Sequence, residues 1–212
     1  MSVGSGFDTG TVLEEIGGTG WWLVVEDGGP GRVLAGPFPD RSGAGWAALD
    51  RQAEHPGELR TVYGVRRGDG ALVRRPSPQE WAWLGHLGEQ LDRLSEDWDD
   101  VLSEVDPLTT FVVEVAAALG EAGLPLHDCA GRTDIGSAVG GVCLTPDPEQ
   151  AGIVVAWRQH DRMSMEQVRG AVADGLVQHA MNAALGEVLT ALGFAVETIG
   201  TSGGHLVRSV TP

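Results

Sequence analysis

Short, bulky apolar runs separated by turn residues dominate the first third of the chain. They predict four strands, at Trp21–Glu26, Arg32–Ala35, Thr61–Arg67 and Ala71–Arg75. A proline pair beginning at Pro37 is expected to end the second strand, and Asp40 to cap a short helix. The Asp-Gly turn at Asp69 is typical of a hairpin. We therefore expect a small β(β)αββ domain over 19–76, after a flexible Gly- and Ser-rich tail over 1–18.

The next segment begins with residues whose hydrogen bonds can start a helix. Ser77 can cap the first turn, Pro78 suits the first helical position, and Glu80 can return a hydrogen bond to the Ser77 amide. Apolar residues then recur at alternating spacings of three and four, namely Leu84, Leu87, Leu91, Leu94, Trp98, Val101 and Val105. This heptad seam predicts one long acidic connecting helix over 77–106. The seam is buried either within the chain's own fold or against a second subunit.

The remaining residues, 107–212, predict a second α+β domain with the element order αβββαββ. One helix is expected at Leu108–Ala122, and a capping box at Ser164–Gln167 opens a long helix that Gly193 ends. The strands are expected at Leu124–Cys129, Val139–Thr145, Gly152–His160, Phe194–Ile199 and His205–Val210. The predicted fold class of the whole chain is therefore α+β.

The order and lengths of the elements over 107–212 resemble the small fold shared by type III secretion chaperones and the YbjN-like proteins. The resemblance covers about half of the chain and rests on element order, without a residue motif. It implies a module that binds polypeptides, often as a dimer, and has no catalytic residues of its own.

The formal net charge of −16 narrows the classes of partner. The charge is concentrated over 77–106, where nine acidic residues accompany a single arginine, Arg93. Such a field repels phosphate backbones and anionic membranes, so it disfavours direct nucleic-acid and membrane binding. No apolar run approaches the roughly 18 to 20 residues of a membrane span, and the first residues lack a signal-peptide pattern. We expect a cytoplasmic protein.

A group of histidines and cysteines, His127, Cys129, Cys143 and His160, is the best candidate for chemistry. Imidazole and thiolate ligands suit zinc, and neighbouring strands would bring them together. The cysteines lack the Cys-x2-Cys spacing of a recognisable zinc site, and no helix N-terminus directly follows Cys129 to activate its thiol. The group supports an alternative hypothesis, a metal- or thiol-dependent enzyme, against the simpler interpretation of two buried free cysteines.

Five arginines gather in the hairpin of the first domain, Arg60 and the candidate binding residues Arg66, Arg67, Arg74 and Arg75. A basic β-ribbon suits nucleic acid or an acidic protein surface. Because the acidic helix follows directly in the sequence, we expect the hairpin to pair with that helix, in the same chain or in a second copy.

The acidic helix supports a second alternative, in which it mimics DNA phosphates and inhibits a nucleic-acid-binding protein. The acidic residues concerned are Glu96, Asp97, Asp99, Asp100, Glu104 and Asp106. Runs of this kind are more often solvated helix faces.

These patterns together predict a non-enzymatic, acidic protein-binding or adaptor module, chaperone-like and self-associating, with no cofactor. Its expected partner is another protein, or a second copy of the chain in a homodimer. The candidate partner-binding residues are Leu87, Leu91, Leu94, Trp98, Trp81 and Trp83. Core packing accounts for most tryptophans, and an exposed subset would mark a binding surface.

Overall fold

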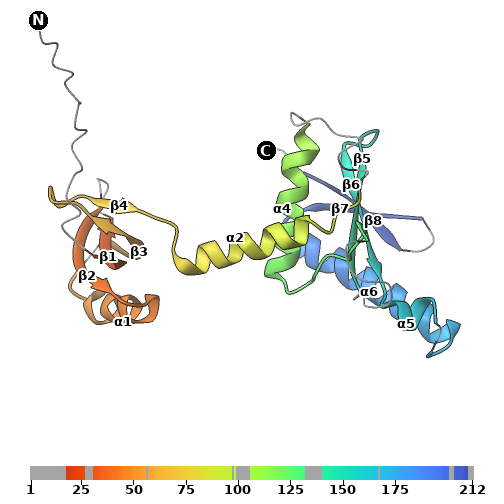
Figure 1. Ribbon diagram of the computed structural model, residues 1–212, viewed down its shortest axis with the longest axis horizontal. Helices are drawn as coiled ribbons and strands as arrows, with labels where there is room; N and C mark the ends of the chain where they lie inside the picture. Colours follow the sequence, from red (N-terminus) through yellow and green to blue (C-terminus); the bar gives the residue numbers. More distant parts are fainter. Residues whose placement is uncertain are drawn as a thin grey trace, which may run out of the picture. The chain divides into compact units, whose positions relative to one another are not determined.

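The computed structural model describes residues 18–26, 31–55, 57–96, 98, 106–131, 140–166, 168–200 and 203–209. The chain forms two compact units, Met1–Ala82 and Trp83–Pro212. The described residues contain five helices and two four-stranded antiparallel sheets, so the predicted α+β class is confirmed (Figure 1). The predicted tail over 1–18 lies outside the described residues, except for Gly18.

The first unit is an antiparallel sheet with one helix packed against it. Its elements are β1 Thr19–Glu26, β2 Arg32–Phe38, α1 Arg41–Arg51, β3 Glu58–Arg66 and β4 Leu72–Arg74, in the strand order β2-β1-β3-β4. Asp40 caps α1 by accepting a hydrogen bond from the Gly43 amide (2.8 Å). Asp69 shapes the β3–β4 turn by accepting one from the Ala71 amide (3.0 Å). The four predicted strands and the short helix are confirmed.

The strand β2 runs further than the sequence predicts. It continues through Pro37 to Phe38, so the expectation that the proline pair ends the strand before Pro37 is wrong. β2 lies at the edge of the sheet, and bulges interrupt its pairing with β1. Proline is compatible with edges and bulges because its missing N–H then breaks no hydrogen bond of the ladder.

The helix α2, Pro78–Leu91, starts with the predicted capping box. Ser77 Oγ accepts a hydrogen bond from the Glu80 amide (3.2 Å), and the Glu80 carboxylate accepts one from the Ser77 amide. The described residues 92–96 are not helical, so the prediction of a single helix over 77–106 is wrong.

Hydrogen bonds from a distant segment replace the expected helix after α2. The Arg93 carbonyl accepts from the amides of Cys129 (2.9 Å) and Ala130 (3.2 Å). The Arg93 guanidinium donates to the Leu126 carbonyl (3.0 Å), and the Gln90 side-chain oxygen accepts from the Leu126 amide (2.8 Å). The chain therefore leaves the helix in order to satisfy backbone groups that a heptad pattern does not reveal.

The second unit is a sheet of order β5-β6-β8-β7 with helices packed on it (Figure 1). Besides most of α2, its elements are α4 Pro107–Glu121, β5 Gly141–Asp147, β6 Gly152–Arg158, α5 Asp161–Ser164, α6 Ala171–Ala191, β7 Ala195–Ile199 and β8 Gly204–Arg208. Asp106 caps α4 through the Leu108 amide (2.9 Å), and Gly123 ends it with φ +79°. The predicted first helix, the final hairpin and the two strands now seen as β5 and β6 are confirmed.

Two predictions for the second unit differ from the structure. The strand expected at Leu124–Cys129 is reduced to one parallel bridge, Leu126 to Val142. The backbone groups of Leu126 and Cys129 bond instead to Gln90 at the end of α2 and to Arg93 just after it. The capping box at Ser164 opens no helix. Ser164 is instead the last residue of α5, and α6 begins after Gly170, whose φ of +86° separates the two helices.

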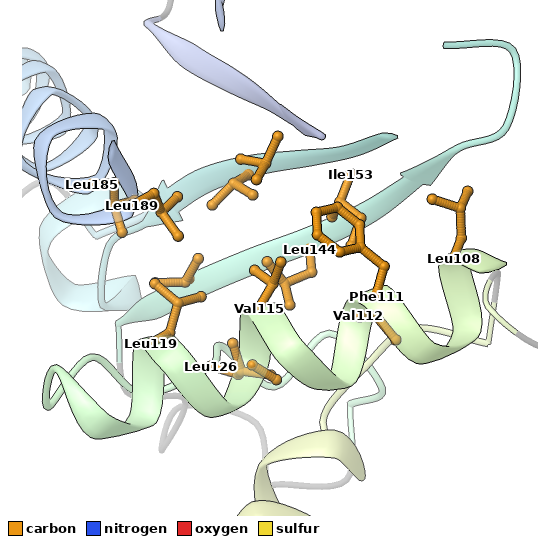
Figure 2. Packing of buried hydrophobic residues seen from close by; sticks show 14 of the residues in the cluster. Leu108, Phe111, Val112, Val115, Leu119, Leu126, Leu144, Ile153, Leu185 and Leu189 are labelled. Atoms are coloured by element: carbon orange, nitrogen blue, oxygen red, sulfur yellow. The ribbon is translucent and has the colours of Figure 1, made fainter. Parts of the chain in front are cut away.

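The core of the second unit lies between the sheet and the helices. Figure 2 shows apolar side chains of α4, among them Phe111 and Leu119, facing Leu144 and Ile153 of the sheet. Leu185 and Leu189 of α6 belong to the same cluster. Antiparallel register places Val155 opposite His205 and Ile153 opposite Val207, so these residues share the sheet face that the helices cover. This core fixes the orientation of α6, which carries the candidate surface described below.

Candidate functional site

The middle of the heptad seam lies in the core of the second unit, whereas its first residue, Leu84, is 51% exposed. Leu87 and Trp98 are buried, Leu91 and Leu94 pack against the same cluster, and the Trp98 indole donates to the Leu144 carbonyl (3.1 Å). These four candidate partner-binding side chains are therefore covered by the chain's own fold. Of the two burial modes that the spacing allows, the structure shows the intramolecular one for these residues. Val101 and Val105 lie outside the described residues.

The tryptophans divide into a buried and an exposed set. Trp21 and Trp22 are buried in β1, and the Trp22 indole donates to the Gly64 carbonyl (3.0 Å). Trp83 is half-buried, with its ring against Gly120. Trp81 is 63% exposed, and Trp46 on α1 is 69% exposed. The exposed subset is thus the one that the sequence argument would assign to a binding surface.

The largest group of exposed apolar side chains in the described part of the second unit lies at the amino-terminal end of α6. Val172 is 79% exposed and Leu176 67%, one helical turn apart on the same face. In the segment that leads from α5 into α6, Met165 is 73% exposed and Val168 55%. The buried residues of α6 all lie in its second half, starting at Asn182. The first half of α6 therefore presents apolar groups that the described core does not use.

Sequence reasoning missed this surface, although a signal was present. The α6 sequence is apolar on more than one side, because Val172 and Leu176 do not lie on the stripe formed by Leu185 and Leu189. A helix that is apolar beyond one stripe is either fully buried or has a second contact surface.

The arginine hairpin is partly neutralised within the first unit. Arg74 pairs with Glu26 (2.8 Å), and Arg67 lies 3.8 Å from Asp69. Arg66 and Arg75 are exposed. The expected pairing of this hairpin with the acidic helix stays a prediction, as does a role in binding a second copy.

The acidic run of the proposed DNA mimic is only partly described. Asp97, Asp99, Asp100 and Glu104 lie outside the described residues. Asp106 has a structural role, because it caps α4. The DNA-mimic hypothesis therefore gains no support from the described residues.

The two cysteines meet beside the edge strand β5. Cys129 Sγ and Cys143 Sγ are 3.2 Å apart, and both thiols are partly exposed. His127 is buried, and His160 caps α5 by accepting a hydrogen bond from the Arg162 amide (3.1 Å). Among the residues that the structure describes, no group of three or more His, Cys, Asp or Glu side chains is arranged to hold a metal ion. Of the four candidates, the structure brings the two thiols together.

The paired thiols have different acidities. The hydrogen bond with the Cys143 thiol, together with the positive charge of Arg158, lowers the pKa of Cys129 to about 7. The same hydrogen bond, with burial, raises the pKa of Cys143. Cys129 is therefore the thiol that ionises first, with Cys143 as the donor to its thiolate.

We expect the rate of Cys129 alkylation by iodoacetamide to reach half of its plateau near pH 7, because the thiolate is the reacting form. An ordinary cysteine would reach that point about 1.5 pH units higher. The measurement is mass spectrometry of the alkylated peptide at several pH values. Cys143→Ala removes the donor and is expected to shift the profile upward. A wild-type midpoint near pH 8.5 would contradict the assignment.

Comparison of the chain with protein-family models, with curated proteins and with solved structures gave no match. No helix in the described part of the chain combines the length and apolarity that a membrane span requires. The class of protein is therefore defined by its fold and surfaces alone, a two-unit α+β protein with an exposed apolar helix face and a close pair of thiols.

Proposed function

We propose that this chain is a non-enzymatic protein-binding module whose second unit binds a basic, amphipathic segment of another protein. The observation that carries the proposal is the exposed apolar start of α6, Val172 and Leu176, with Met165 and Val168 exposed in the segment that precedes it. Exposed apolar groups gathered at one place on a folded unit are typical of interaction sites. An amphipathic helix or strand of a partner would bury them.

The chemistry of the partner follows from charge. The residues of the second unit, 83–212, include nineteen acidic and six basic side chains, a formal net charge of −13. Close to the apolar face, Arg162 pairs with Glu166 (3.9 Å). Residues 161–174 contain three acidic residues and two arginines, a formal net charge of −1. A field of this sign attracts basic segments and accelerates their association. Two copies of the unit would instead repel one another, which favours a different protein over self-association.

The test uses the full chain and a fluorescently labelled Lys/Leu peptide with an amphipathic helical pattern, followed by fluorescence anisotropy. We expect binding that weakens as salt increases. Leu176→Glu is expected to weaken it at least about tenfold, since truncating or charging an apolar anchor commonly costs 1.4 kcal/mol or more. Leu192→Glu, at the other end of the same helix, is the matched control and should leave binding unchanged.

Three results would contradict the proposal. One is the absence of binding to the amphipathic peptide, and another is equal binding of a peptide with the same composition in scrambled order. The third is an equal loss of binding in the Leu176 and Leu192 variants. Light scattering in line with size exclusion gives the oligomeric state, and a dimer that Leu176→Glu converts to a monomer would assign the face to self-association instead.

A further inference from the structure

Cys129 and Cys143 form a close pair of thiols that the proposed binding function does not use. They are the only cysteines in the chain, and 3.2 Å separates the two sulfur atoms. A disulfide requires a sulfur–sulfur distance of about 2.05 Å, so the sulfurs need to approach by only about 1.2 Å. Thirteen residues separate the two positions in the sequence, so the fold, and not sequence proximity, brings them together.

We propose that Cys129 and Cys143 are a redox-active dithiol that reduces a low-molecular-weight disulfide and is converted to an intramolecular disulfide. Cys143 lies on β5, opposite Ala156 of β6. Cys129 lies in the irregular segment after the Leu126 bridge, where its amide donates to the Arg93 carbonyl (2.9 Å). One thiol is thus held by the sheet, while the other lies outside any regular strand. Both residues are partly exposed, as a reaction with a small substrate requires.

The reaction consists of two thiol–disulfide exchanges. In the first, the Cys129 thiolate attacks one sulfur of the substrate R–S–S–R, the substrate S–S bond breaks, and RS⁻ leaves and takes a proton from water to become RSH. In the second, Cys143 loses its proton to solvent and attacks Cys129 Sγ, which releases the other RS⁻, again protonated to RSH. Two protein thiols are oxidised to one disulfide, and one substrate disulfide is reduced to two thiols.

The surroundings assign the first attack to Cys129. Once Cys129 is ionised, the Cys143 S–H is the group that can donate to it across 3.2 Å, and the positive charge of Arg158 favours ionisation of both thiols. Arg158 pairs with Gly141, two residues before Cys143 on β5, so it projects to the same sheet face as Cys143. The neighbouring Asp128 carboxylate opposes ionisation of Cys129 as a smaller effect. Cys143 is the resolving thiol because it is the one thiol left in the chain once Cys129 carries the substrate sulfur.

The experiment treats the reduced full-length protein with oxidised glutathione at pH 7 and follows its mass. The wild-type chain is expected to lose the mass of two hydrogen atoms while remaining monomeric, and to accumulate no glutathione adduct. Because the chain contains two cysteines, this mass loss assigns the bond. Cys143→Ser should hold one glutathione as a stable mixed disulfide. Cys129→Ser should react about threefold more slowly than Cys143→Ser. Its remaining thiol, Cys143, has a smaller thiolate fraction at pH 7, and the greater intrinsic nucleophilicity of that thiolate offsets only part of the difference.

The wild-type measurement stands even if a serine variant fails to fold. Stable glutathione adducts on both wild-type cysteines would overturn the proposal, as would a disulfide that forms only in urea or only between two chains. Equal reaction rates of the two serine variants, with native circular dichroism, would overturn the assignment of Cys129 as the attacking thiol. None of these outcomes depends on the apolar face of α6, so this proposal and the proposed binding function are tested separately.

Discussion

Replacing Trp98 with alanine is expected to destabilise the second unit by about 3–5 kcal/mol, the cost typical of deleting a buried tryptophan. Trp98 is 8% exposed, belongs to the same cluster as Leu87 and Leu144, and donates to the Leu144 carbonyl (3.1 Å). The variant loses this apolar contact area and leaves the carbonyl without its indole donor. Urea unfolding followed by far-ultraviolet circular dichroism measures the loss as a lower midpoint.

A matched control separates burial in the core from burial at an interface. Trp81→Ala removes a tryptophan that is 63% exposed, and its effect on unfolding is expected to stay within about 0.5 kcal/mol. If the seam instead held two subunits together, the wild-type midpoint would rise with protein concentration, and Trp98→Ala would abolish that dependence. We expect midpoints that do not depend on concentration.

Local chemistry made much of the fold predictable from the sequence. Three local features have all their hydrogen-bonding partners within a few residues, namely the capping box at Ser77, the cap at Asp40 and the turn at Asp69. A short stretch of sequence is therefore enough to predict each of them. The prediction that the helix continues beyond Leu91 is wrong for the opposite reason. The groups that compete with it belong to Leu126 and Cys129, whose positions are set only by tertiary structure.

The candidate sites were less predictable than the fold. The heptad spacing correctly marked Leu87 and Trp98 as residues to be buried, but spacing does not specify what buries them. The cysteine pair has no motif spacing, and its proximity arises because the segment after Leu126 lies beside β5. The exposed start of α6 could not be predicted from the apolar pattern, because the pattern does not say which apolar residues the rest of the fold covers. The exposure of a side chain depends on the whole fold around it, and the spacing of apolar residues along one helix does not reveal that fold.

Replacing Gly186 with alanine is expected to destabilise the second unit by about 1–3 kcal/mol, although glycine-to-alanine changes within helices normally stabilise. A Cβ at this position of α6 would lie 2.7 Å from His205 Cε1 and 2.9 Å from Nε2. The ring has little freedom to move, because it is 5% exposed and its Nε2 donates to the Asn182 carbonyl (2.6 Å). Thermal unfolding of the full chain measures the effect.

Gly175→Ala on the same helix is the matched control, since no atom lies within 4 Å of its added Cβ. It should stabilise the unit by about 0.5–1 kcal/mol through helix propensity alone. The contrast between the two glycines isolates the contact with His205 from the intrinsic preference of the helix. In a His205→Ala background that contact is absent, so Gly186→Ala should then cost nothing or stabilise, a coupling that a double-mutant cycle quantifies. Equal effects of Gly186→Ala in both backgrounds would show that the glycine is not required by the histidine ring.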